Sequence, residues 1–294
     1  MRAAAIFGLG CSSRQLSPFQ IDRSIEWRIG LPSPGEAVDV VILFGGDGTV
    51  HRHLSPLASL GLPVLVVPTG SGNDFARALG LRRVRDSLTA WRRFLRQQDN
   101  VRSIDLGLIT PCDAGKTSTG ENSSSHFCSV AGIGLDCEVA RRANRLPRWL
   151  RGHGGYALSL ASTFLRFAPF PVKILTQADT GEWSTRSHQP TILTAFANSP
   201  AYGGGMKIAP RAKMDDGQLD VCVIAGIDPF KLACTFPTVY FGGHIEVRGV
   251  QYFQAYRIRV ETESPQDVYA DGEYVSRTPV EIGVQPAALK VLMP

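Results

Sequence analysis

The residue types best suited to chemistry gather in one glycine-rich stretch, Gly-Gly-Asp-Gly-Thr at residues 45–49. The preceding residues 40–44 are β-branched, aliphatic and aromatic, which predicts a buried strand. Thr49 can then cap a helix that begins at Val50 and continues through Leu57. A strand, a glycine turn and a helix start together bind phosphate well, because glycines let backbone N–H groups approach an anion and the helix start supplies further donors.

Asp47 adds a second requirement to this stretch. A carboxylate beside phosphate groups repels them unless a cation lies between the two. Its presence in the glycine turn therefore favours a nucleotide bound with Mg²⁺ over bare phosphate.

A second stretch repeats this arrangement. The apolar residues 63–68 predict another buried strand, and Thr-Gly-Ser-Gly-Asn-Asp follows at 69–74. Asn73 or Asp74 can cap a helix that runs through Leu79. Two such units in succession predict adjacent parallel strands with both loops at one sheet edge, where open α/β sheets bind ligands. The candidate phosphate-binding and cation-binding residues are Gly45, Gly46, Asp47, Gly48, Thr49, Gly70, Ser71, Gly72, Asn73 and Asp74.

The remaining pattern predicts two domains in these 294 residues. A first strand over residues 2–7, an amphipathic helix over 84–98 and an alternating strand over 101–109 complete an α/β part. A strand over 127–131, a turn at 132–134 and helices over 135–145 and 154–166 follow. Beyond Pro169, strands dominate, at about 171–177, 190–197, 219–225, 250–262, 267–270, 279–284 and 288–292, with one helix at about 229–241.

The expected fold class is therefore α/β, with two parts of different character. Residues 1–105 are expected to form a Rossmann-like nucleotide-binding domain. Residues 106–294 are expected to form a β-rich, β-sandwich-like domain, whose last strand at about 285–294 can pack back on the first domain.

Composition excludes few classes of function for this protein. A net charge of +5 and a pI near 9.0 permit an anionic partner without choosing among nucleotide, acidic lipid and nucleic acid. No apolar run reaches the roughly eighteen residues that a membrane-spanning helix needs. The six cysteines are scattered without metal-site spacing, which favours reduced thiols in the cytoplasm. The N-terminal apolar segment is better explained as a strand than as a lipoprotein signal.

Taken in order, the motifs resemble those of the bacterial diacylglycerol kinase-like lipid kinases, a family that includes sphingosine kinase-type catalytic domains. The matching pieces are residues 45–49, 68–80, 104–107 (Ile-Asp-Leu-Gly), 132–136, Asn198 with 203–205, 209–220, and 271–273 (Asp-Gly-Glu). The resemblance implies an ATP-dependent kinase that transfers the γ-phosphate to a lipid hydroxyl, such as that of diacylglycerol, in a cleft between two domains.

The resemblance also implies roles for individual residues. Glu273 would be the proton acceptor, and Asp271 and Asp47 would join it in the catalytic set. Structural Mg²⁺ would be held by the Asp216 carboxylate with the backbone carbonyls of Lys213 and Gln218. Nucleotide contacts would fall on Gly46, Asp47, Gly48, Thr49, Val50, His51, Arg52 and Ser71.

The chain departs from the family pattern in its first half. His51-Arg52 replaces the usual Asn-Glu pair, and residues 7–10 lack the usual Asn-Pro loop. The segment ahead of residue 45 is also short, so a nucleotide-contacting Thr of the relatives has no clear counterpart.

Local sequence alone leaves several residues with two readings. Asp271-Gly272 is also a strong hairpin-turn signal, and residues 215–217 can be a turn or a cation site. Asp105 can face the cleft or pair with a base, and Asn198 can cap a strand or bind substrate.

The expected partners are a lipid alcohol and, transiently, the inner face of a membrane. Arg141, Arg142, Arg145, Arg148 and Arg151 surround Trp149, which suits an anionic lipid surface, although a solvated helix face would look the same. No recognised nucleic-acid module is present, and a homodimer is left open. Two rival functions remain: a soluble-substrate kinase of the NAD kinase type, and a nucleotide-binding regulatory protein with little turnover.

Overall fold

The structure is a computed structural model of the chain. The structure describes residues 1–112, 124–135, 137–138, 141, 167–226, 228, 231 and 234–294. The chain divides into two compact units, which are Met1–Leu106 with Pro286–Pro294 (unit 1) and Gly107–Gln285 (unit 2).

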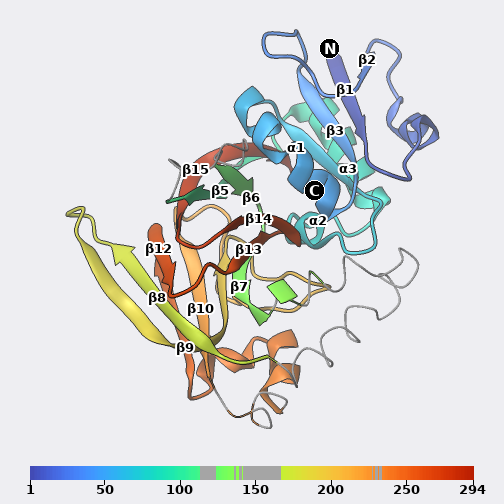
Figure 1. Ribbon diagram of the computed structural model, residues 1–294. Helices are drawn as coiled ribbons and strands as arrows, with labels where there is room; N and C mark the ends of the chain where they lie inside the picture. Colours follow the sequence, from blue (N-terminus) through green and yellow to red (C-terminus); the bar gives the residue numbers. More distant parts are fainter. Residues whose placement is uncertain are drawn as a thin grey trace. The chain divides into compact units, whose positions relative to one another are not determined.

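Unit 1 is built on a parallel sheet in the order β2-β1-β3-β4-β15 (Figure 1). The strands are β1 (Arg2–Phe7), β2 (Glu26–Ile29), β3 (Val40–Gly45), β4 (Val64–Pro68) and the end of β15 (Val280–Leu292). All residues of β3 and β4 are buried, as expected for central parallel strands that are covered on both faces. Their carboxyl ends lie side by side, because Phe44 pairs with Val67 and Gly45 with Pro68.

Helices α1 (Asp47–Leu60), α2 (Asp74–Ala78) and α3 (Val84–Gln97) and the 3₁₀ helix η1 (Ser13–Phe19) complete unit 1. Helix α3 buries Trp91, whose indole N–H donates to the carbonyl of Phe19 at 2.8 Å. This bond ties α3 to a segment for which sequence patterns had predicted no element. Strand β2, in the same segment, was also missed.

The predicted start of the first helix was wrong by three residues. Helix α1 begins at Asp47, with extended Gly46 as its N-cap, and the N–H groups of Thr49 and Val50 both donate to the Gly46 carbonyl. The glycine at position 46 therefore serves as the cap, and Thr49 already lies in the first turn.

Unit 2 is dominated by antiparallel strands, in the order β14-β13-β7-β9-β8-β12-β15, with β10 pairing with β9 and β11, and β5 with β6. The strands are β5 (Val101–Pro111), β6 (Ser125–Phe127), β7 (Val130–Gly134), β8 (Phe170–Gln177), β9 (Trp183–Ala197), β10 (Leu219–Ala225), β11 (Val250–Ala255), β12 (Arg257–Thr262), β13 (Asp267–Ala270) and β14 (Glu273–Arg277). Among the described residues, the short 3₁₀ helices η3 (Phe236–Tyr240) and η4 (Gly243–Glu246) interrupt them.

Successive residues of the central strands enter two different apolar clusters. On β10, Val221 and Val223 pack in one cluster, whereas Cys222 and Ile224 pack in the other. On β9, Phe196 joins the first cluster and Ala195 the second. Because the strand period is two, burial of both sets covers these strands on both faces, as in a sandwich.

Several predicted boundaries in unit 2 need correction. The predicted turn at 132–134 is part of β7, and the chain instead breaks at Cys128 and Ser129. The predicted strand over 250–262 divides at Tyr256, because β11 pairs with β10 while β12 pairs with β8 and β15. Of the predicted helix at 229–241, the described residues 231, 234 and 235 are helical, and the 3₁₀ turn η3 follows them. Most of the predicted helices over 135–145 and 154–166, and all but one residue of the arginine cluster, lie outside the described residues.

Within the described part of the chain, none of the helices has the length and apolar character needed to cross a bilayer. No disulfide joins the six cysteines, all of which are described.

Candidate functional site

The two predicted glycine loops of unit 1 touch each other. A Cβ atom on Gly70 would lie 2.6 Å from the Cα of Gly46, and one on Gly46 would lie 2.9 Å from the Cα of Gly70. Neither position can therefore carry a side chain while this contact persists. The N–H of Thr69 also donates to the carbonyl of Gly45, at 3.1 Å. The two loops thus form one continuous backbone surface at the carboxyl ends of β3 and β4.

A third loop reaches the same edge from β1. The N–H of Gly8 donates to the carbonyl of Phe44 at 2.7 Å, and the Cys11 sulfur lies 3.1 Å from the hydroxyl oxygen of Thr69. Sequence patterns gave no signal for Cys11, because a single thiol in a polar loop carries no spacing information.

Asn73 shapes the second loop with its side chain. Its Oδ1 accepts the N–H of Gly70 at 2.9 Å, and its Nδ2 donates to the carbonyl of the same residue at 2.6 Å. The backbone of Asn73 is left-handed, with φ of 56°, a conformation that asparagine tolerates better than most residues. Asn73 does occupy the N-cap position of α2, but its side chain closes the loop and does not cap the helix.

Asp47 braces the two loops. Its Oδ1 accepts the N–H of Phe75, in the first turn of α2, at 3.1 Å. Its Oδ2 faces Gly72, where an added Cβ would lie 2.6 Å away. The carboxylate also stands in the first turn of α1, where the helix dipole favours negative charge. Part of the need for an aspartate here is therefore structural, since this side chain caps the helix of the neighbouring loop.

The other predicted nucleotide residues divide by exposure. Asp74 pairs with Arg77 at 2.6 Å, and Arg77 also donates to the carbonyl of Gly72. Arg77, in α2, thus binds the loop that precedes its own helix, a contact that the sequence did not indicate. The side chain of Val50 is buried, so its contribution to any ligand would be through the backbone. By contrast, Gly48, Arg52, Gly70 and Ser71 are exposed, and Thr49, His51 and Gly72 are partly exposed.

In unit 2, Asp271 and Gly272 form the turn between β13 and β14. Both have positive φ, 51° and 86°, as a two-residue hairpin turn of the primed type requires. The hairpin-turn reading of this motif is therefore right. Glu273 follows as the first residue of β14, opposite Ala270, and is exposed.

The Asp271 carboxylate is anchored by three consecutive backbone N–H groups. Oδ1 accepts from Ser129 at 2.9 Å and Val130 at 3.3 Å, and Oδ2 accepts from Cys128 at 3.0 Å. The N–H of Asp271 returns a bond to the carbonyl of Val130 at 3.0 Å. These bonds explain why the strand breaks at 128–129, and they hold the hairpin that carries Glu273. Asp271, expected in the catalytic set, thus acts in this structure as a positioning residue.

Asn198 holds the same segment from the end of β9. Its N–H donates to the carbonyl of Ser129 at 2.8 Å, and its Nδ2 donates to the carbonyl of Cys128 at 3.1 Å. Its side chain is fully buried. The motifs around Asn198 and Asp271, distant in sequence, therefore meet at the 128–130 segment. The sequence did not point to Cys128 and Ser129, because their main contribution is through backbone N–H groups; the Cys128 thiol also lies 3.5 Å from Asp271 Oδ2.

We expect Asp271→Asn to lower the free energy of unfolding of unit 2 by about 1–3 kcal/mol, because an amide offers one acceptor oxygen where three N–H groups need two. Urea unfolding monitored by fluorescence measures this loss. Asp267→Asn on the same hairpin is the matched control, since it removes only an exposed ion pair with Arg277 and should cost less than about 1 kcal/mol. Equal losses for the two variants would contradict the anchoring role.

The predicted Mg²⁺ residues lie before β10. Asp216 Oδ1 accepts the N–H of Gln218 at 3.1 Å. Gln254 Nε2 lies 3.3 Å from Asp216 Oδ2 and 3.2 Å from Asp220 Oδ2, so one amide bridges two carboxylates. Asp220 is buried and accepts the Tyr252 hydroxyl at 2.7 Å. Burial, reinforced by the charge of Asp216, raises the pKa of Asp220 above its usual range.

This region supplies oxygen donors, which suit Mg²⁺, but few of these oxygens belong to side chains that commonly bind metal ions. Within the described ranges, no group of three or more His, Cys, Asp or Glu side chains could hold a metal ion. The proposed set of Asp216 with the carbonyls of Lys213 and Gln218 therefore stays a prediction. Gln254 joins Asp216 to the pair of Asp220 and Tyr252, and neither Tyr252 nor Gln254 was singled out from sequence.

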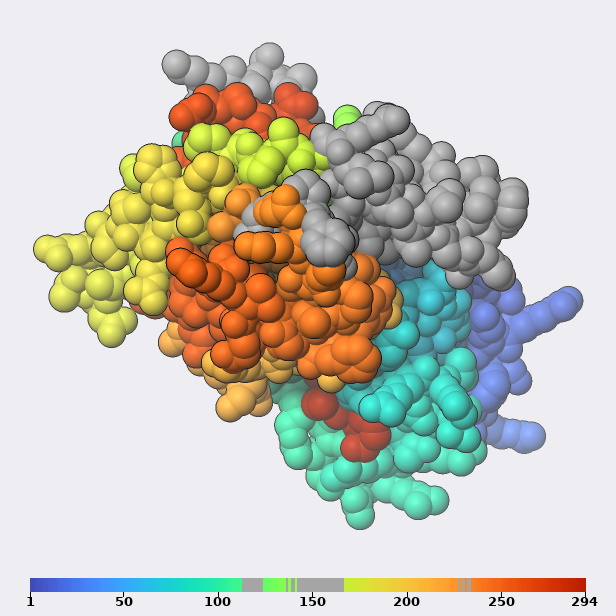
Figure 2. All heavy atoms as spheres, turned by 90° about the horizontal axis from the view of Figure 1, so that it is seen from below, coloured from blue at the N-terminus to red at the C-terminus, as the bar shows by residue number. Residues whose placement is uncertain are grey.

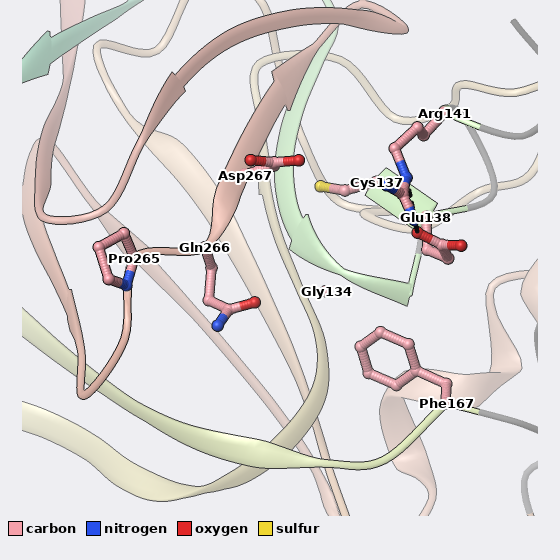
Figure 3. Close-up of a pocket in the computed structure, with 8 residues that line it drawn as sticks. All are labelled: Gly134, Cys137, Glu138, Arg141, Phe167, Pro265, Gln266 and Asp267. Carbon is pink, nitrogen blue, oxygen red and sulfur yellow. Dashed lines mark hydrogen bonds and ion pairs between the residues drawn. The ribbon is translucent and has the colours of Figure 1, made fainter.

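Unit 2 also contains a cavity of about 240 Å³, which none of the predicted catalytic, nucleotide-binding or Mg²⁺ residues lines (Figure 3). Its walls are mostly polar and carry the Arg141–Glu138 ion pair and Asp267, which pairs with Arg277. The cavity lies at the end of the β13–β14 hairpin away from Glu273, since Asp267 pairs in register with Arg277. The lining residues are Gly134, Cys137, Glu138, Arg141, Phe167, Pro265, Gln266 and Asp267.

Comparison with known families matches both parts of the chain. The diacylglycerol kinase catalytic domain matches residues 33–109, and the YegS C-terminal NAD kinase beta sandwich-like domain matches residues 129–293. The Mycobacterium tuberculosis protein named diacylglycerol kinase is 33% identical over 259 residues, which cover 88% of this chain and 78% of the relative.

Solved structures confirm the predicted fold class. A Bacillus anthracis protein assigned as a diacylglycerol kinase has a TM-score of 0.73 at 23% identity, covering 100% of this chain and 95% of the other. An Archaeoglobus fulgidus NAD kinase in complex with ATP has a TM-score of 0.52 at 15% identity, covering 100% and 93%. Two-domain kinases of this fold therefore include both lipid kinase relatives and an NAD kinase.

The order of the motifs, the two matching domain families and the identity to the mycobacterial relative all agree. Membership of a kinase family supports a phosphotransferase activity. The chain belongs to the family of diacylglycerol kinases and YegS-like lipid kinases.

Proposed function

We propose that this protein is an ATP-dependent lipid kinase that transfers the γ-phosphate to the hydroxyl of a lipid alcohol, with diacylglycerol as the first candidate. The observation that carries the proposal is the contact of two glycine loops, Gly46 on Gly70, at the carboxyl ends of adjacent parallel strands. Such a surface offers backbone N–H donors without side chains in the way, which suits a polyphosphate.

In this proposal the triphosphate lies on the glycine loops of unit 1. The fourteen-residue helix α1 begins at this edge and directs its positive dipole end toward it. Exposed Gly48 and Ser71 offer backbone N–H groups, and Arg52, in the second turn of α1, adds a positive charge. The mutual bracing by Asp47 and Asn73 keeps these donors in place before the ligand arrives, which reduces the cost of ordering them.

The chemistry of the proposal rests on the β13–β14 hairpin. Glu273 accepts the proton of the lipid hydroxyl while the oxygen of that hydroxyl bonds to the γ-phosphorus. At the same time the bond between the γ-phosphorus and the bridging oxygen of the β-phosphate breaks, and ADP leaves. Asp271 contributes by holding the turn that carries Glu273 against the 128–130 segment.

Mg²⁺ is part of this proposal in two places. Asp47 and Asp74 are the carboxylates beside the triphosphate loops, and Asp216 with the carbonyls of Lys213 and Gln218 would hold a structural ion. Oxygen donors from one or two carboxylates fit a hard cation that keeps several waters. A bound Mg²⁺ would neutralise phosphate charge.

The relatives support the lipid acceptor, since the mycobacterial protein is named a diacylglycerol kinase. The likeness to an NAD kinase concerns the fold, and it keeps a soluble acceptor as an outcome to be tested. A lipid acceptor in turn implies transient contact with a membrane.

The decisive experiment offers labelled γ-phosphate ATP, with Mg²⁺, to the purified chain. Diacylglycerol, monoacylglycerol and sphingosine in mixed micelles are compared with NAD in solution. Label in a lipid product supports the proposal and ranks the acceptors. Label in NAD alone would replace it with the NAD kinase reading, and ATP binding without any transfer would favour a regulatory protein.

A further inference from the structure

An exposed group of aromatic side chains stands on the 3₁₀ helices of unit 2. We define the aromatic tip as Phe236, Pro237, Tyr240 and Phe241. Phe241 is 84% exposed, the largest exposure among the large apolar side chains of the described residues, and Tyr240 is 44% exposed. The rings of Phe236 and Tyr240 pack edge to face, with centroids 6.0 Å apart. Figure 2 shows the segment that carries them, in orange, at the molecular surface.

The backbone beneath the tip is anchored on both sides. Val239 is buried in an apolar cluster with Met206 and Ile208. His244 is fully buried, and its Nε2 lies 3.0 Å from the carbonyl oxygen of Ile208. The backbone of this segment is therefore fixed on both sides by buried residues, and the fixed segment exposes the rings to solvent.

Gly242 makes the anchoring tighter. Its φ is +79°, and a Cβ atom there would lie 2.7 Å from the Cβ of Pro210. The turn after Phe241 therefore packs closely on the 209–211 segment. Only glycine combines this conformation with this approach.

Exposed cations flank the tip. The N–H of Lys207 donates to the carbonyl of Val239 at 3.0 Å, which places the backbone of Lys207 against η3, the helix that carries Phe236 and Tyr240. Within the described residues of segments 207–211 and 228–248, four side chains are cationic and two are acidic. The acidic Glu246 is paired with Arg211 at 3.0 Å. The cations are Lys207, Arg211, Lys231 and Arg248, all exposed.

We propose that the aromatic tip docks the protein on an anionic lipid bilayer. Aromatic rings are suited to the bilayer interface, where their apolar faces leave water, and nearby lysine and arginine side chains are attracted to anionic head groups. The rings supply the apolar contact and Lys207 with its neighbours supplies the complementary charge. The inference rests on the proposed function, because a kinase with a lipid acceptor must reach a bilayer.

The test is co-sedimentation with vesicles of phosphatidylcholine alone and of phosphatidylcholine mixed with phosphatidylglycerol. The wild type should bind the mixed vesicles more tightly. The double variant Tyr240→Ala with Phe241→Ala should bind both compositions at least about tenfold more weakly, the scale expected for losing the burial of aromatic side chains. Lys207→Glu should weaken binding to the anionic vesicles only, and this loss should shrink as salt is added.

Ile21→Ala is the matched control, because Ile21 is 49% exposed but lies in unit 1. Unchanged binding of the double variant and of Lys207→Glu would overturn the proposal. So would a wild type that ignores vesicles and forms a dimer that the double variant disrupts, which would make the tip a contact between copies. Equal thermal unfolding of wild type and variants excludes loss of the fold as the cause.

The same samples separate this inference from the proposed function. Transfer to a lipid alcohol dispersed in detergent micelles should be the same for wild type and the double variant. Tip-dependent vesicle binding without transfer to any lipid alcohol would leave the docking surface standing and remove the kinase proposal. Transfer to a lipid alcohol without tip-dependent vesicle binding would support the kinase proposal and remove the docking surface.

Discussion

Glu273→Gln is expected to slow phosphoryl transfer to the lipid by about 10²- to 10⁴-fold, the usual contribution of a general base. Glutamine has nearly the same shape as glutamate but does not accept the hydroxyl proton. Glu273 is exposed at the start of β14, so the substitution removes no buried contact and should leave the fold unchanged. The measurement is single-turnover transfer of labelled γ-phosphate, together with ATP affinity, which should not change.

Glu263→Gln supplies the control for this result. Glu263 is an exposed glutamate of the same unit, in the connection between β12 and β13. Its substitution should leave the transfer rate within about twofold of wild type, as expected for a surface site. A Glu273→Gln enzyme that is equally active would exclude this carboxylate as the base and direct attention to the loop carboxylates Asp47 and Asp74.

The second large effect is expected at the contact between the glycine loops. In Gly70→Ala the new methyl group would stand 2.6 Å from the Cα of Gly46, so the loops must separate. Overpacking of this kind costs about 1–3 kcal/mol. If that cost falls on the arrangement that binds nucleotide, the Kd for ATP should rise by about 5- to 150-fold.

Calorimetric titration of ATP into the wild type and the variant measures this change. Gly283→Ala is the matched control, because its nearest neighbour would be a carbonyl oxygen at 3.6 Å, an ordinary contact. Unaltered ATP affinity in Gly70→Ala would show that the nucleotide does not depend on the joined loops. The regulatory reading and the kinase reading both predict the loss of affinity, so this experiment tests the site independently of the reaction.

The two structural anchors of the candidate site use the same device. Asp47 on one unit and Asp271 on the other each accept backbone N–H groups from a segment remote in sequence. Each aspartate belongs to a motif that also suggested chemistry. The structural and the chemical readings of these motifs are therefore compatible, because the same side chain that shapes a loop can stand beside a ligand.

Sequence by itself determined the fold class, the succession of the main strands along the chain, and the family. Continuous apolar runs such as residues 40–44 are short-range signals, since burial on both faces of a parallel sheet leaves little room for polar residues. Glycine at a strand end is an equally local signal, because a residue without a side chain permits close backbone approach and, as at Gly272, positive φ. For the same reason the two residues Asp271 and Gly272 were enough to predict a turn.

Only the tertiary structure decided which residues meet. The contact of Gly46 with Gly70, the bond from Phe75 to Asp47 and the convergence of Asn198 and Asp271 on segment 128–130 join residues that no local pattern relates. The break of the strand at 128–129 and the division of β11 from β12 have the same origin, since the partner strands and the anchoring carboxylate come from elsewhere in the chain. Backbone N–H and carbonyl groups make most of these contacts, and because every residue type carries them, the sequence does not mark which ones are used.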